Sequence, residues 1–425
     1  MLFFKFKAGA LQLTLFIVVI IALLLAGFIL FTHIHNRFKV QTSFVIETIT
    51  NANKGIDYFL LNNIKTNDTT AVKLNEEDYK TLKLVHSSWG VFEKVVSISK
   101  IKTNSLKKVA LIGAIQPELY RTALYIQDNN KPLVLVGNTK IEGLAYLPER
   151  GVKSGTISGQ SYYGTQLIYG PTKIASNLPS LNTEIEKQCA AFKNLIKTIN
   201  PKQLIAIDPG KSYTNSFLEP LQMVYSNSAI RLNNNRFIGH IIIQSKTKII
   251  VDNTAILKDV ILIAPDIEIQ SNVNGNFQAI ATKNIIIGKN SNLKYPSSLV
   301  LIEEETINVV NKGTNKNVNH IKIDANSKVK GIVLFKGETQ KSNYKANIEI
   351  EKGAIIYGEV YCNENTELEG KIYGSIFTNN FVANQFGSIY QNHIYNGTII
   401  VDNLQQEYVG LLFKNSKKGI VKWLY

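Results

Sequence analysis

Short aliphatic triplets recur at one constant interval in the second half of the chain, beginning at Ile249, Ile267 and Ile285. Positions two and fourteen places further on stay apolar in every copy: Val251, Ile269 and Ile287, then Ile263, Ala281 and Leu299. Positions three places on are polar or small: Asp252, Gln270 and Gly288. Alternation of apolar and polar positions with period two predicts a short strand with one buried face.

A repeat of roughly 18 residues is too short for a helix pair or a propeller blade. It fits one coil of a parallel β-helix, with about three short strands and three corners. Stacked coils would bury the aliphatic columns in one continuous core, so the segment is expected to be a solenoid. The alternative is an antiparallel sandwich with many turns.

An apolar-x-Gly-x-apolar unit continues the pattern toward the C-terminus, with Gly331, Gly358 and Gly374 at its centre and an earlier copy at Gly143. Glycine in this pattern marks a corner that a side chain would crowd. We therefore expect the first β-helix coils at residues 133–180, an interruption at 181–235, the main parallel β-helix at 236–403 and a C-terminal cap at 404–425.

The interruption contains one amphipathic helical segment, NTEIEKQCAAFKNLIKTIN. Thr183 and Glu186 are close to capping-box spacing, and one face carries Ile185, Cys189, Phe192 and Ile196. We expect this helical insertion to cover the side or the open end of the solenoid. Cys189 and Cys362 are far apart in the sequence, so no disulfide framework is implied.

The amino-terminal region carries no charge from Ala8 to Thr32 and is long enough to span a bilayer. Residues 1–39 are therefore predicted to be a leader and a single-pass anchor, residues 40–63 a proline-free stalk helix, and residues 64–132 a small antiparallel β-rich region. A turn is expected at Asn104-Ser105. The short amino-terminal tail favours a body on the outer side of the membrane, and a cytoplasmic body is the alternative.

The leader MLFFKFKAG, followed by ALQLT and an unbroken apolar helix, resembles a type IV prepilin signal. The resemblance implies cleavage after Gly9 and a mature chain beginning at Ala10. Thr14 stands where that family usually has a glutamate, which certain minor pseudopilins also lack. An ordinary uncleaved anchor is the alternative.

The segment IEIEKGAIIYGEVYCNENTELEGKIYGSIFTNNFVAN, with corners at Gly358 and Gly374, resembles the rungs of bactofilins, which are polymer-forming bacterial β-helix proteins. The resemblance covers under a tenth of the chain. Bactofilins consist of little but the helix, whereas this chain carries an anchor and many further residues.

The formal net charge is +15, and almost all of it comes from lysine. Nucleic-acid binders concentrate arginine and interleave aromatic residues, so no specific nucleic-acid partner is expected. The partners predicted are the membrane, subunits of a pilus-like or secretion assembly, and an anionic polysaccharide or cell-wall polymer.

Candidate catalytic chemistry is not found in the sequence, and no catalytic residue, cofactor or metal is predicted. His33 and His35 would point apart on a helix. Asp252, Asp259 and Asp266 have a spacing that differs from the repeat, and Glu303-Glu304-Glu305 interrupts the repeat.

The expected function is a bacterial inner-membrane envelope structural protein, a minor pilin-like or scaffold subunit. The alternative is a membrane-tethered β-helix protein that binds or cleaves carbohydrate.

Overall fold

The computed structural model describes residues 9–424 except 63, 65, 67, 74–77, 117–120, 193, 304–318, 339–343 and 415; the side chain of Cys189 is also outside the description. The chain is mainly β and divides into two compact units. The first unit comprises residues up to 59 together with 69–84 and 97–108, and the second comprises the remainder.

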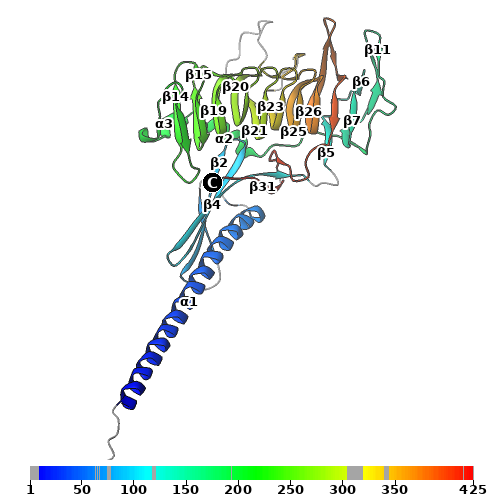
Figure 1. Cartoon of the computed structure of the whole chain (residues 1–425). Helices are drawn as coiled ribbons and strands as arrows, with labels where there is room; N and C mark the ends of the chain where they lie inside the picture. Colours follow the sequence, from blue (N-terminus) through cyan, green and yellow to red (C-terminus); the bar gives the residue numbers. More distant parts are fainter. Residues whose placement is uncertain are drawn as a thin grey trace, which may run out of the picture. The chain divides into compact units, whose positions relative to one another are not determined.

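Helix α1 (Gly9–Leu61) dominates the first unit and runs without a break, as predicted (Figure 1). Its 53 residues correspond to about 80 Å at 1.5 Å per residue. The amino-terminal part is apolar and exposed, with a mean hydropathy of 3.2 in its most apolar window, so the helix is long and apolar enough to cross a membrane. The buried side chains lie in the last turns, from Thr48 to Phe59.

A small antiparallel sheet contains strands β1 (Thr69–Val72), β2 (Lys80–Trp89), β3 (Phe92–Ile101) and β4 (Asn104–Ile115), neighbours in that order. The predicted turn at Asn104-Ser105 is wrong by two residues. Lys102 has a φ of 53° and forms the turn with Thr103. In the second unit, β30 (Val409–Gly410) and β31 (Lys417–Leu424) pair antiparallel with β4, so the segment predicted as a C-terminal cap joins this sheet.

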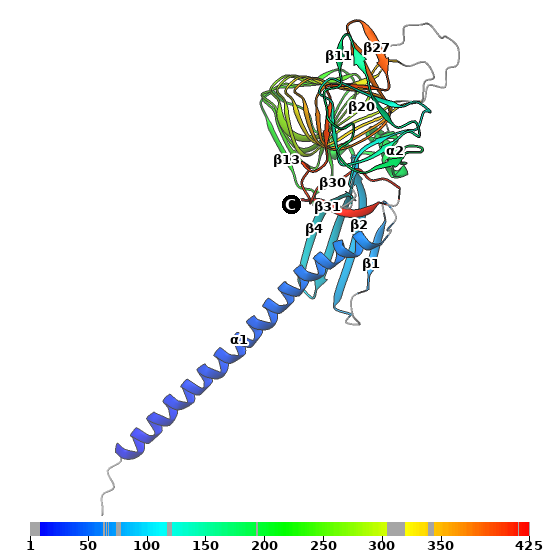
Figure 2. The same ribbon diagram turned by 90° about the vertical axis from the view of Figure 1, so that its right-hand side faces the viewer.

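A closed, almost wholly parallel sheet forms most of the second unit (Figures 1 and 2). Its strands are β5 (Thr122–Ile126), β7 (Lys140–Glu142), β8 (Leu144–Leu147), β12 (Thr172–Ile174), β13 (Ser212–Asn215), β14 (Gln222–Ser226), β15 (Ile230–Leu232), β16 (Arg236–Gly239), β17 (Ile241–Ser245), β18 (Lys248–Val251), β19 (Ile256–Ile269), β20 (Asn274–Ile287), β21 (Asn292–Ile302), β22 (His320–Ile323), β23 (Lys328–Lys336), β24 (Ile348–Ile350), β25 (Ile355–Leu368), β26 (Lys371–Gln385), β27 (Ser388–Gln391) and β29 (Thr398–Ile400). Here β27 pairs antiparallel with β26.

Two smaller sheets and three short helical segments accompany the closed sheet among the described residues. Strands β6 (Leu133–Val136), β9 (Val152–Ser154) and β28 (His393–Tyr395) form a parallel three-stranded sheet, and β10 (Thr156–Ile157) pairs antiparallel with β11 (Gln160–Ser161). The helical segments are α2 (Thr183–Phe192), α3 (Leu195–Thr198) and the 3-10 turn Pro201–Gln203. Strands β13 to β15 belong to the closed sheet, so parallel pairing extends into the range expected to be the helical insertion.

The first aliphatic column is in register as the constant spacing predicts. Ile249 pairs with Ile267, and Ile267 with Ile285. The column continues through Ile321 and Ile348, beyond the regular repeat. These five side chains are at most 1% exposed. Parallel pairing throughout this column contradicts the antiparallel sandwich.

The third predicted column is wrong. Ile263 pairs with Ile280 rather than Ala281, and Leu299 pairs with Ala279. For Ile263 the cause is a β-bulge at Asp259, which has a φ of 62° and inserts one residue between two regular stretches of β19. For Leu299 it is a second irregularity, between Gly275 and Gln278, where β21 contributes two more residues than β20. Ile263 therefore points outward from the sheet interior and packs in a second apolar cluster.

The predicted glycine corners form a stack. Gly331 pairs with Gly358, and Gly358 with Gly374, all with φ between 139° and 148°. A Cβ on Gly358 would lie 1.9 Å from the carbonyl oxygen of Gly331, and one on Gly374 would lie 2.0 Å from that of Gly358. Only glycine fits both the backbone conformation and the close approach of adjacent strands.

A second corner column was not foreseen. Asn272, Asn290 and Asn326 each have a positive φ between 59° and 65°, and each lies at the same offset from the start of an aliphatic triplet. Asparagine tolerates the left-handed conformation better than other non-glycine residues. The recurrence of asparagine at this one repeat position is the sequence signal that locates these corners.

Candidate functional site

The stalk half of α1 packs closely on the strands of the first unit. A Cβ on Gly55 would lie 2.2 Å from Ser97 Oγ and 3.0 Å from a methyl carbon of Leu84, so no larger residue fits at this contact. Lys80 Nζ lies 2.5 Å from Glu47 Oε1, and Lys102 lies over the ring of Phe44. One helix thus combines an exposed apolar end with an end that packs on the strands of the first unit.

The predicted processing site lies at the start of this helix. Gly9 is the first residue of α1, and a Cβ there would meet nothing within 4 Å; Ala10 is also exposed. Residues 1–8 of the leader are outside the described part of the chain, so cleavage after Gly9 stays a prediction. Thr14 Oγ1 donates to the carbonyl oxygen of Leu11 at 2.9 Å, which satisfies the hydroxyl within the helix.

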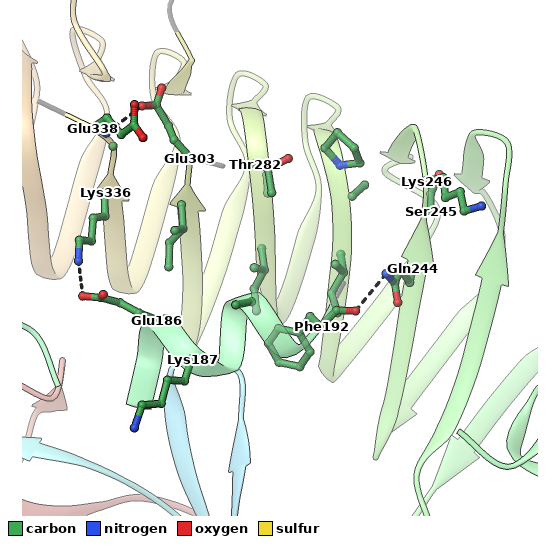
Figure 3. A pocket seen from close by; sticks show the side chains of 18 residues that line it. Glu186, Lys187, Phe192, Gln244, Ser245, Lys246, Thr282, Glu303, Lys336 and Glu338 are labelled. Carbon is green, nitrogen blue, oxygen red and sulfur yellow. Dashed lines mark hydrogen bonds and ion pairs between the residues drawn. The ribbon is translucent and has the colours of Figure 1, made fainter. Parts of the chain in front are cut away.

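A groove of about 750 Å³ lies beside α2 on the outer face of the closed sheet (Figure 3). Its apolar lining includes Phe192, Ile263 and Ile280, and its polar rim is formed by Lys246, Thr282, Glu303 and Glu338. Concave sites with an apolar floor and a few polar groups are typical ligand pockets. This groove is therefore the candidate binding pocket of the second unit.

Helix α2 is held over the groove at both ends. Glu186 forms an ion pair with Lys336, and Gln244 Nε2 donates to the carbonyl oxygen of Phe192 at 3.2 Å (Figure 3). The helix thus lies against the side of the closed sheet. Its N-cap is Asn182, whose Oδ1 accepts from Glu184 N, and not the predicted Thr183.

Carboxylates gather on another face of the closed sheet. Asp252, Glu268 and Asp324 line a polar hollow of about 620 Å³. Nearby, Lys322 Nζ contacts Glu349 Oε1 at 2.8 Å and Glu351 Oε1 at 2.7 Å. Within the described ranges, no group of three His, Cys, Asp or Glu side chains is arranged to hold a metal ion.

The predicted acidic residues have separate contacts. Asp252 accepts from Thr254, Asp259 binds Lys422 at 2.6 Å, and Asp266 accepts from Asn284 Nδ2 at 2.7 Å. The three carboxylates therefore do not form one cluster. Glu303 accepts from Asn319 Nδ2, whereas Glu304 and Glu305 lie outside the described residues.

A buried polar pair, Lys94 and His240, was missed by sequence reasoning. His240 Nδ1 lies 2.9 Å from the carbonyl oxygen of Glu219, so this nitrogen carries the proton and Nε2 accepts from Lys94 Nζ at 3.0 Å. The rings of Trp89 and Phe217 pack on His240. Burial lowers the pKa of Lys94 to about 8, and burial together with Lys94 lowers the pKa of His240 to about 4.

This pair predicts a specific pH dependence. The folded-state pKa of Lys94 is below its ordinary value of 10.5, so the unfolded chain binds more protons between about pH 8 and 10.5. Over this range wild type should gain up to about 3 kcal/mol of stability relative to Lys94→Met. Chemical denaturation of both proteins at pH 7.5 and 10 measures the difference. A constant difference would show that Lys94 is not desolvated.

A buried glutamate connects the closed sheet with the C-terminal segment. Glu359 Oε2 accepts from Leu411 N at 2.5 Å, and Gln116 donates to Oε1. Burial raises the pKa of Glu359 to about 7. Cys362 on the same strand is a buried free thiol whose pKa burial raises to about 12, which makes it an inert packing residue.

No family model matches the chain, and no curated protein matches it. Among solved structures, the chain is similar to the crystal structure of the competence-associated pilin ComZ from Thermus thermophilus. The TM-score is 0.21 with 10% sequence identity, over 85% of this chain and 86% of that chain. A TM-score this low does not establish a shared fold. The bactofilin resemblance has no support among these comparisons.

Proposed function

We propose that the closed parallel sheet is a parallel β-helix and that the chain is a membrane-anchored bacterial envelope protein, acting as a minor pilin-like subunit of a pilus or secretion assembly. The β-helix is supported by successive parallel pairings at one repeat length, from Ile249 to Ile267 to Ile285. It is also supported by the stack of glycine corners at Gly331, Gly358 and Gly374. The subunit would present this solenoid as a rigid surface.

The observation that carries the proposal is the division of α1 into two halves. Its apolar half is exposed over a stretch long enough to span a bilayer, and its second half packs on antiparallel strands through Ala52, Gly55, Ile56 and Phe59. An exposed apolar helix in water is unfavourable, so this half requires lipid or the apolar helices of other subunits. A helix that serves both as anchor and as part of a folded head suits an assembly subunit.

The proposed location is the bacterial cytoplasmic membrane, crossed once, with residues 40–425 on the outer side. Thr14 supports a minor or tip position. In the family that the leader resembles, major subunits use a carboxylate at this place to register against a neighbour, whereas the Thr14 hydroxyl is satisfied by Leu11.

Substituting the processing site tests the proposal. Gly9→Leu should abolish removal of the leader and co-purification with pilus or secretion components, because the peptidase of that family cuts after glycine. Gly27→Leu is the matched control, since Gly27 lies in the same helix and a Cβ there would meet nothing within 4 Å. This control should be processed and assembled like wild type.

Two outcomes would contradict the proposal. Assembly of the unprocessed Gly9→Leu chain at wild-type levels would show an ordinary anchor. Depolymerisation of a glycan by the purified protein would favour the alternative, a tethered carbohydrate-active β-helix, for which the hollow lined by Asp252, Glu268 and Asp324 would be the candidate site.

A further inference from the structure

One outer face of the closed sheet is basic along its length. Its residues occupy equivalent outward positions that pair from strand to strand: Ile238 with Lys258, Asn292 with Lys328, Lys330 with Tyr357, and Ile355 with Lys371. We name the exposed cations of this face the basic ladder: Arg236, Lys258, Lys294, Lys328, Lys330 and Lys371. The strands of this face, from β16 to β26, extend over roughly 29 Å, at about 4.8 Å per strand.

The basic ladder is free of compensating carboxylates. None of its six cations forms an ion pair with any residue in the described ranges. The one carboxylate further along the same face in those ranges, Glu142, is bound by Lys140 at 2.6 Å. By contrast, Lys248 and Lys322 on the carboxylate-bearing face are both ion-paired. Unpaired cations held in a line on a rigid sheet raise the local potential and attract a polyanion.

We propose that the basic ladder binds a linear acidic polysaccharide lengthwise, with lysines contacting carboxylates that recur along the glycan. The inference rests on the proposed β-helix, which keeps these side chains in a line, and it does not require the membrane assembly. The cations are exposed, and all of them except Arg236 are lysines. Lysine is a point charge that pairs with single carboxylates without the bidentate geometry of arginine.

The aromatic residues of this face favour a polysaccharide over a nucleic acid. Single-stranded nucleic acids stack their bases on open aromatic rings. Here the rings of Tyr357 and Tyr373 lie 5.2 Å apart at 56° and are half-buried, and Lys330 lies over Tyr357 at 5.4 Å. Lys330 thus covers a face of Tyr357, and the tilted contact with Tyr373 leaves no pair of open parallel rings for stacked bases.

The test is binding of the full chain, in uncharged detergent micelles, to polygalacturonate. Lys328→Gln, Lys330→Gln and Lys371→Gln together should weaken binding about tenfold, since each exposed ion pair contributes a modest amount. The matched control replaces Lys131, Lys202 and Lys283 by glutamine, because these are exposed lysines outside the ladder. It makes the same change in net charge and should bind like wild type. Both triple variants should keep the wild-type melting temperature.

Three results would overturn the proposal: no binding by wild type, equal loss in both triple variants, or tighter ladder-dependent binding of poly(dT) than of polygalacturonate. The last would identify a nucleic-acid surface. Each is distinguishable from failure of the proposed assembly role, because processing at Gly9 is measured separately and in membranes.

Discussion

Ile267→Asp is expected to unfold the strands around it, lowering the free energy of unfolding by more than about 5 kcal/mol. Ile267 is 1% exposed and lies between Ile249 and Ile285 in the core of the closed sheet. The substitution removes an aliphatic side chain, which alone costs about 2–5 kcal/mol, and adds a carboxylate that has no partner there. A loss of this size is comparable to the total stability of many domains.

Thermal unfolding of the full chain in detergent, followed by circular dichroism, measures the effect. Gln270→Asp is the matched control, because Gln270 lies three residues further along the chain and is only half-buried. It should melt close to wild type. Equal melting temperatures for both variants would mean that the register is wrong and that the aliphatic columns do not form the core.

Gly358→Ala is expected to lower the free energy of unfolding by about 4 kcal/mol, although it adds only a single methyl group. Its backbone has a φ of 148°, a conformation that non-glycine residues adopt only at a cost of about 1–3 kcal/mol. The new Cβ would also lie 1.9 Å from the carbonyl oxygen of Gly331, which forces the adjacent strands apart. Denaturant titration of the full chain measures the loss.

Gly151→Ala separates these two causes. Gly151 has a positive φ of 68°, but a Cβ there would have no neighbour within 4 Å. Gly151→Ala should lower the free energy of unfolding by about 1–2 kcal/mol, which is the cost of the backbone conformation alone. If Gly358→Ala were no more destabilising than Gly151→Ala, the close stacking of the glycine corners would be contradicted.

The repeat in the sequence predicted the columns that regular strands keep in register. Ile249, Ile267 and Ile285 are aligned by parallel pairing, and asparagine accommodates the same turn at Asn272 and Asn290. A single inserted residue disturbs the register only locally, because the pairing offset is restored between Ala264 and Asp266. The bulge at Asp259 changes the offset between paired strands, so Ile263 lies outside the core although its period matches.

The buried polar groups could not be predicted because their partners are distant in the chain. Lys94 and His240 are 146 residues apart, and Glu359 and Leu411 are 52 apart. Neither contact recurs at a fixed interval along the chain, so no repeat in the sequence predicts it. The basic ladder differs from these buried pairs, because its lysines occupy equivalent positions on successive strands. Lysine is nevertheless spread over the whole chain, so only the pairing of the strands shows that these lysines share one face.

The most direct test of the proposed assembly role is the amino terminus of the protein extracted from membranes. Mass spectrometry of the amino-terminal peptide should show a mature chain that begins at Ala10, with the exposed apolar half of α1 immediately after it. A membrane-bound chain that still begins at Met1 would contradict the pilin-like role and leave an uncleaved single-pass anchor.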